Sequence, residues 1–382
     1  MTATLTLDGI RVLDFGTRPS TAWCGRLLAD FGAQVIGVET SPHPLRSQGP
    51  FDPDGNSIVS RYLLAGRDLL QDAATPALMS AAHVILTSDT HEASALQQDH
   101  PQAIVCAITP YGLTGAHSGE PGNDLTACAG SSWAYVNGLQ GRPPLKCSGL
   151  QASYQSGTFA FGILLAALIE QLAHNSPGQL IDISEREVLV STAAPAPLRY
   201  QYSGFNWARK SGVDMNEGPV PVKDGWFALT ISRPAFWIKA MEVLGLPDLA
   251  TDKELQQAGL RPKLKDRFVD RVGSAMSEWT RMDLFNALGE RRVIAGPVLR
   301  MDELADNPQF VARGFFREAS DGLKYPGPFA RMTASGWRTP GPRPRKVTSF
   351  DANAEIKTTP VRAARGGQGP LAGFRGLVLT QA

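Results

Sequence analysis

The sequence has few of the residues that form cross-links. It contains four cysteines and six histidines in 382 residues. No two cysteines form a C-x-x-C pair, and no two histidines have the spacing of a metal-binding helix. Scattered cysteines of this kind are typical of reduced thiols in a cytoplasmic protein. We therefore expect neither a disulfide framework nor a metal site.

An excess of one charge and a long hydrophobic run are also missing. Lys and Arg number 37 against 36 Asp and Glu, which gives no electrostatic reason to expect nucleic acid or an anionic membrane as a partner. The longest apolar run, 159–168, contains Gly162 and is too short to span a bilayer. The first eight residues do not have the pattern of a signal peptide. We expect a soluble cytoplasmic protein.

The first 202 residues have the pattern of a parallel α/β domain. The run 10–15 is a predicted strand, the helical spacing from Thr21 ends at Gly32, and 34–39 is a second strand. Such a βαβ unit implies parallel strands and a right-handed crossover. The other predicted elements are strands at 84–87, 104–108 and 179–184 and helices at 158–174 and 185–198. Residues 1–202 are therefore predicted to form a doubly wound, Rossmann-like domain.

The pattern changes after residue 202. A strand at 226–231, a strand near 297–299 and amphipathic helices at 235–244, 264–278 and 281–290 predict a small α+β domain over 203–315. Short β-like pieces at 316–340 are predicted to return to the large domain. The Pro-, Gly- and Arg-rich stretch 341–370 is predicted to be a linker. Residues 371–382 can be laid on 7–17, and this match indicates the start of a second copy of the fold, with chance as the alternative.

Two places in the large domain could carry chemistry. The loop 16–22 follows the first strand, where its hydroxyls and helix N-terminal amides could hold a phosphate or a pantetheine group, or simply connect two elements. Ser153 precedes the long apolar helix, where a nucleophile could lie. It has no G-x-S-x-G elbow and no histidine nearby, so helix capping is the competing interpretation. Asp124 is interpreted as a helix cap.

Ordered sequence blocks place the chain beside a known family. The segments LDGIRVLDF and AWCGRLLADFGAQVIGVE within 7–39 resemble the opening of the class III CoA-transferases. This family includes formyl-CoA and carnitine CoA-transferases and α-methylacyl-CoA racemase. Later blocks look similar in the same order: HPQAIVCAITPYGLTG, GNDL, GILLAAL with PGQLIDIS, KDGWFAL and NPQFVARGFF. The resemblance runs from residue 7 to about residue 335.

The resemblance implies a Rossmann-like large domain, a smaller α+β domain and two chains interlocked as linked rings. It also implies chemistry on one aspartate, which carries acyl anhydride and thioester intermediates. In the family this aspartate lies four residues before the glycine of the long helix. Counting back from Gly157 places Ser153 there. The racemase pair of His and Asp matches Asn123 and Ser153.

Several basic residues of the family are also replaced in this sequence. By resemblance, the CoA-site positions are Pro19, Ser20, Thr40, Arg67, Ser88 and Asn123. Thr40 and Glu120 stand where the family often has a basic residue, and 87–91 replaces an Arg-containing stretch. Because the phosphates of CoA require cations, this pattern predicts weakened CoA binding in this half.

These differences from the family pattern leave three alternative functions. The first is a non-catalytic half of a class III CoA-transferase, whose partner is a family domain that carries the aspartate. The assembly would be a homodimer or a heterodimer, with CoA and acyl-CoA as substrates, small carboxylic acids as co-substrates and no permanently bound cofactor. The second is an active transferase, hydrolase or lyase that uses Ser153. The third is a small-molecule binding protein on this fold.

Overall fold

The computed structural model describes residues 5–193, 196–209, 218–319, 322–338 and 345–351. The chain divides into two compact units. The first takes in the described parts of 1–138, 143–208 and 312–382, and the second takes in those of 139–142 and 209–311. The predicted second copy of the fold at 371–382 lies outside the described residues.

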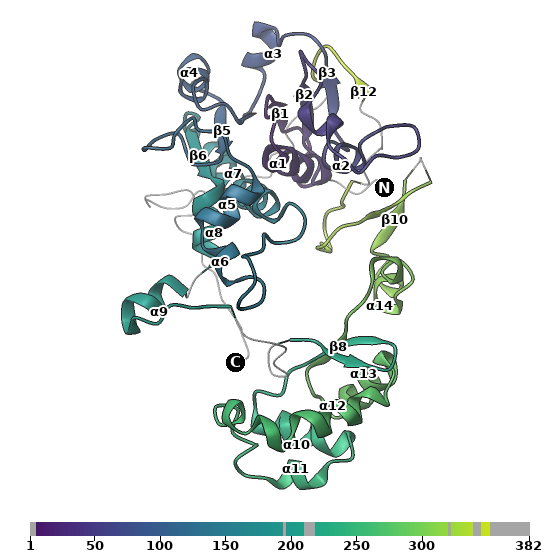
Figure 1. The fold of residues 1–382 in the computed structure, drawn as a ribbon. Helices are drawn as coiled ribbons and strands as arrows, with labels where there is room; N and C mark the ends of the chain where they lie inside the picture. The colour runs from purple at the N-terminus through teal and green to yellow at the C-terminus, as the bar shows by residue number, and fades with distance from the viewer. Residues whose placement is uncertain (1–4, 194–195, 210–217, 320–321, 339–344, 352–382) are drawn as a thin grey trace. The chain divides into compact units, whose positions relative to one another are not determined.

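A seven-stranded parallel sheet forms the centre of the first unit (Figure 1). The strand order is β12-β3-β2-β1-β4-β5-β6. Apart from β12, this is the order of a Rossmann sheet, in which the strand sequence reverses between β1 and β4. The strands are β1 Arg11–Asp14, β2 Gln34–Val38, β3 Asp68–Leu70, β4 Val84–Thr87, β5 Ile104–Thr109, β6 Leu180–Ser184 and β12 Arg345–Lys346. The predicted α/β fold class is confirmed.

Alternate strand residues bury opposite faces of this sheet. Val12 belongs to a core with the helices α1 (Pro19–Asp30) and α7 (Gln151–His174), whereas Leu13 belongs to the core on the other face. The remaining helices of the unit are α2 Ile58–Leu63, α3 Pro76–Ser80, α4 Ala93–Asp99, α5 Asp124–Gly130, α6 Trp133–Val136, α8 Glu185–Thr192 and α9 Ala196–Ser203, and the short 3-10 turn η1 is Pro44–Ser47. The helix α14, Pro308–Ala312, belongs to the second unit except for its last residue. Burial on both faces is typical of a parallel sheet and explains the nearly continuous apolar strands.

Part of the predicted linker 341–370 belongs to the sheet. Of its described residues, Arg345 pairs with Asp68 of β3 at 2.9 Å, and Phe350 is buried in the core beneath the sheet. A composition rich in charge and proline did not reveal this strand, because it is two residues long and lies at the edge. Residues 316–318 (β10) and 324–326 (β11) form a separate antiparallel pair.

The second unit is a small α+β body. Its antiparallel sheet has the order β7-β8-β9, with β7 Val220–Val222, β8 Gly225–Leu229 and β9 Ala295–Pro297. Its helices are α10 Pro234–Val243, α11 Pro247–Thr251, α12 Val269–Ser277 and α13 Arg281–Glu290, with 3-10 turns η2 Arg261–Lys263, η3 Lys265–Arg267 and η4 Met301–Glu303. Trp237, Phe227 and Phe268 are the largest buried apolar side chains of its core.

The helix α7 is longer than its apolar run indicates. It spans 24 residues and contains an 18-residue window with a mean hydropathy of 1.5, so by length and composition alone it is apolar enough to cross a membrane. Its side chains Ala160, Phe161 and Leu164 are buried in the core against α1 and the sheet. We therefore interpret α7 as a core helix.

Gly157 is required for the contact between α7 and α1. A Cβ atom at this position would lie 2.5 Å from the backbone oxygen of Ser20 and 3.0 Å from Cδ1 of Trp23. Because backbone cannot move as a flexible side chain does, Gly157→Ala is expected to destabilise the protein by about 1–3 kcal/mol. The matched control is Gly162→Ala in the same helix, where a Cβ meets nothing within 4 Å; we expect it to be neutral or to gain about 0.5–1 kcal/mol. Urea unfolding measures both, and equal effects would contradict the close packing.

Candidate functional site

Ser153 is bonded to a carboxylate inside the first unit. The helix α7 begins at Gln151, so Ser153 lies in its first turn and its side chain is 2% exposed. Its Oγ donates to Oδ2 of Asp124 at 2.8 Å. The backbone N–H of Ala152 donates to Oδ1 of the same carboxylate at 2.7 Å. Asp124 therefore binds two donors at the beginning of α7.

Two predictions about this region are corrected by these contacts. Ser153 is not a helix cap, because the N-cap position of α7 is Leu150 and α7 starts before the predicted residue 158. Asp124 does not cap its own helix. That helix, α5, is capped by Asn123, whose Oδ1 accepts the N–H groups of Leu125 and Thr126. Asp124 instead satisfies a free amide of α7, which allows that helix to begin early.

Burial dominates the electrostatics of Asp124. Loss of hydration raises the pKa of its carboxyl, the bonds from Ser153 and the Ala152 amide lower it in part, and the charge of Glu185 raises it. A buried carboxyl with a raised pKa is a better proton acceptor than an exposed one. The pair can therefore hold a proton between hydroxyl and carboxylate.

Glu185 forms a second buried cluster close to Asp124. It is the first residue of α8 and is fully buried. Its carboxylate accepts two bonds from Arg18, at 3.1 and 2.6 Å, and one from the hydroxyl of Ser20 at 2.6 Å. Arg18 also donates to the carbonyl of Gly122 at 2.9 Å, next to Asn123. The cluster ties the beginning of α1 to α8 and to the loop before α5.

Sequence reasoning missed Arg18 and Glu185. Arg18 lies in the loop after β1 and Glu185 directly follows β6, so both stand after the carboxyl ends of parallel strands. Polar residues in that position were the available signal, because those strand ends meet at one edge of the sheet.

Two of the predicted CoA positions line a separate cavity. It has a volume of about 570 Å³ and lies at the carboxyl ends of β1, β2 and β4, where the strand order reverses. Thr40 and Ser88 are on its wall. The Oγ of Ser88 accepts the N–H of Thr17 at 3.0 Å. Pro19, half-buried, is the first residue of α1 and does not line this cavity.

Arg67 lies in the interior and not on the cavity wall. Its guanidinium contacts Asp14 at 2.7 Å and donates to the carbonyl of Ala22 at 2.7 Å, and both charged side chains are almost completely buried. Gly25 makes room for this pair, because a Cβ there would lie 2.8 Å from the Asp14 carboxylate. The structure thus separates the predicted site residues. Ser20 and Ser153 donate to the two carboxylates, and Asn123 caps α5. Thr40 and Ser88 line the cavity, and Arg67 pairs with Asp14. Within the described part of the chain, no three metal-ligating side chains converge.

His43 makes the stability of this region depend on pH. It is buried beside the cavity, its Nδ1 accepts the N–H of Leu45, and its Nε2 faces the carbonyl of Gly16 at 3.1 Å. Burial, followed by the charge of Arg67, lowers its pKa from 6.5 to about 4. Between these values the unfolded chain binds a proton that the folded chain does not, so stability is present above pH 6.5 and is lost as the pH falls to 4.

The expected loss from His43 is about 3 kcal/mol between pH 6.5 and pH 4. Urea unfolding of the protein and of His43→Gln over this range measures it, and the variant should have the smaller slope. Part of the remaining slope belongs to His83, whose pKa burial also lowers to about 4. His174→Gln, at an exposed position, is the control. An unchanged slope in His43→Gln would show that His43 is charged in the folded protein.

Known proteins identify the family to which this fold and these residues belong. The model of CoA-transferase family III matches residues 7–71 and 86–346. The chain belongs to CoA-transferase family III. The predicted family membership is therefore confirmed, and the Rossmann order of the sheet is the fold expected of a family III chain.

Family III relatives align over most of their length. The succinate–glutarate CoA-transferase of Agrobacterium fabrum is 27% identical over 350 residues, which cover 84% of this chain and 87% of that protein. The alpha subunit of succinyl-CoA–L-malate CoA-transferase from Chloroflexus aurantiacus is 26% identical over 347 residues, 82% of this chain and 78% of the subunit. A crystal structure of a CAIB/BAIF family protein from Brucella suis superposes with a TM-score of 0.78 at 24% identity, over 90% of this chain and 97% of that one. This last likeness concerns the fold.

Proposed function

We propose that this chain serves the transfer of CoA between an acyl-CoA thioester and a carboxylic acid, as the half of a family III assembly that does not carry the nucleophile. Family membership and the transferase activities named for its relatives support the reaction class. The observation that carries the non-catalytic role is Ser153, which stands at the position of the family aspartate by resemblance. Its hydroxyl is buried and donates to Asp124.

The chemistry of the two side chains explains this choice. A carboxylate can attack a thioester carbonyl at neutral pH without losing a proton, whereas a hydroxyl must first be deprotonated. The Ser153 hydroxyl is 2% exposed and its proton points to a carboxylate that also bonds Ala152. These contacts favour a role in holding α7 to α5.

The partner in this proposal is a second family III domain that carries the aspartate, either in another copy of the fold on the same polypeptide or in a separate chain. The Chloroflexus relative is named as an alpha subunit, which supports an assembly of different chains. The described segment around α9 supports it too, because no residue of α9 is buried and Tyr200, Tyr202 and Trp207 are exposed. Interlocked rings, as the resemblance implies, would cover these side chains.

The test compares the purified chain alone with the chain co-expressed with a family III domain that has Asp at the matching position. With succinyl-CoA and glutarate as probes, the chain alone should give no transfer above the blank. The assembly should transfer CoA, should lose this activity when the partner's aspartate becomes Asn, and should keep it with Ser153→Ala in this chain. Transfer by the chain alone would overturn the proposal.

One observation favours a second candidate, an active enzyme that uses Ser153. The hydroxyl and the carboxylate of Asp124 are 2.8 Å apart, which is the arrangement of a nucleophile and a proton acceptor. Ser153 Oγ would attack the thioester carbonyl, its proton would pass to Asp124, and the C–S bond would break to release CoA. The acyl group of the resulting Ser153 ester would then pass to water or to a carboxylate, and the serine hydroxyl would be restored.

This candidate has its own measurement. Incubation of the chain alone with succinyl-CoA, followed by peptide mass spectrometry, should show a succinyl group on Ser153, and Ser153→Ala should abolish both the adduct and all turnover. A chain that turns over succinyl-CoA without an adduct, and equally well as Ser153→Ala, rules the serine out.

A further inference from the structure

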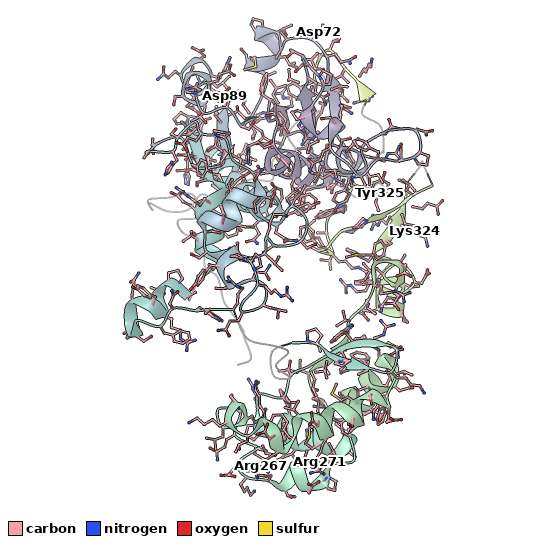
Figure 2. All side chains as sticks on the ribbon, viewed as in Figure 1. Asp72, Asp89, Arg267, Arg271, Lys324 and Tyr325 are labelled. Carbon is pink, nitrogen blue, oxygen red and sulfur yellow. The ribbon has the colours of Figure 1, made fainter. Side chains whose placement is uncertain are left out.

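The cavity at the carboxyl ends of β1, β2 and β4 has charged side chains of one sign on its wall. Among the described residues that line it, Glu39, Asp89 and Glu92 are acidic and none is Lys or Arg. Asp89 follows β4 and lies beside the turn into α4 (Figure 2). His43, also on the wall, has a pKa lowered to about 4 by burial and is neutral at physiological pH.

The acids of the wall are only partly compensated. Glu39 accepts two bonds from Arg46, at 2.9 and 2.8 Å. Asp89 accepts the backbone N–H groups of His91 and Glu92, at 2.7 and 3.1 Å, and is otherwise exposed. Glu92 is exposed. The cavity therefore carries net negative charge.

Two of the backbone amides after β1 already have acceptors within the protein. In an α/β fold these amides are the usual donors to a ligand phosphate. Here the N–H of Gly16 donates to Oδ1 of Asp14 at 2.8 Å, and the N–H of Thr17 donates to Oγ of Ser88 at 3.0 Å. A phosphate entering the cavity would meet carboxylates and would have to displace these internal bonds.

We infer that this cavity rejects the phosphate-bearing end of CoA. The sheet places a ligand site at the reversal point, but like charges and occupied amides make it repel a diphosphate or a 3′-phosphate. This inference rests on the proposed function, in which the acyl-CoA of the reaction is held by the other family domain. Thr40, Asp89 and Glu92 are then the specificity-determining residues of this chain.

Isothermal titration of the purified chain with CoA tests the inference directly. The unaltered protein should bind with a dissociation constant weaker than about 1 mM. The triple variant Thr40→Arg/Asp89→Asn/Glu92→Gln removes two negative charges and adds one positive charge at exposed positions, and the new amide at position 89 would keep an acceptor oxygen for the turn. We expect it to bind CoA at least about tenfold more tightly in low salt, with a gain that shrinks as salt is added.

Two further variants keep the result interpretable. Asp89→Asn/Glu92→Gln alone, which adds no long side chain, should give a smaller gain and serves if the triple variant does not fold. Asp54→Asn/Asp270→Asn removes two negative charges, as the double variant does, but at exposed residues that do not line the cavity. It should bind CoA no better than the unaltered chain. Micromolar binding by the unaltered chain, or an equal gain in this control, would overturn the inference.

This experiment is independent of turnover. A failed reconstitution of transferase activity would count against the proposed function and would leave the binding result standing. Tight binding of CoA by this chain would overturn the cavity inference, while the assembly assay would still decide whether Ser153 or a partner's aspartate is needed.

Discussion

Replacing Arg67 by methionine is expected to destabilise the protein by about 3–5 kcal/mol, because it leaves the carboxylate of Asp14 buried without its cation. Asp14 lies at the end of β1, and its side chain is fully buried against Arg67 at 2.7 Å. Burial already raises the pKa of Asp14, and the charge of Arg67 is the largest effect that opposes this. Thermal and urea unfolding of Arg67→Met measure the loss.

The matched control for this prediction is Arg46→Met. Arg46 bonds Glu39 with equally short distances, but its side chain is 37% exposed. A pair of this kind contributes about 0–1 kcal/mol. By resemblance, Arg67 is one of the CoA-binding positions. If Arg67→Met weakened CoA binding and left the unfolding transition unchanged, that result would contradict the structural role argued for Arg67.

Asp124→Ala is expected to have the second largest effect, a loss of about 2–4 kcal/mol in the free energy of unfolding. The variant removes two hydrogen bonds and leaves the amide of Ala152 and the hydroxyl of Ser153 buried without an acceptor. The beginning of α7 would fray, since helix amides need a partner there. Unfolding curves and hydrogen exchange at the first turn of α7 measure the change.

Ser153→Ala separates the carboxylate from its hydroxyl partner. It removes one donor to Asp124 and keeps the other, so the expected loss is about 1 kcal/mol. Since the Ser153 bond lowers the pKa of Asp124, the variant should also raise that pKa further. Asp124→Asn tests the charge alone, because the amide keeps an acceptor for Ala152. A larger loss for Ser153→Ala than for Asp124→Ala would show that the serine, and not the aspartate, holds the two helices together.

The strands of the central sheet could be predicted closely from the sequence. The apolar runs at 84–87, 104–108 and 179–184 coincide with β4, β5 and β6 to within one residue. The strands β4 and β5 are buried along their whole length, so each is a continuous apolar run. The strand β6 lies at the edge of the sheet and is interrupted by the exposed Asp182, but its apolar residues still mark it. The strands β3 and β12 were not predicted, because they have three and two residues and lie toward the edge of the sheet, where burial imposes little pattern.

The helix boundaries depended on contacts distant in sequence. The apolar pattern placed the start of the long helix at residue 158, whereas α7 begins at Gln151. The additional turn carries Ser153 and is capped by Asp124, which is 28 residues away from Ala152 in the chain. No local pattern of residues 146–157 contains that information.

The sequence by itself determined the fold class and the family, because buried strands and ordered motifs are written as local patterns of apolar and glycine residues. Through the resemblance it also predicts that Ser153 stands at the position of the family aspartate. Only the tertiary structure decided what the polar residues do. Hydrogen bonds and ion pairs form between side chains that the fold brings together. Arg18 and Ser20 met Glu185, and Ser153 met Asp124, only when strand ends and helix termini came together in the fold. Arg67, just before β3, met Asp14 at the end of β1 only when the strands had packed into one sheet.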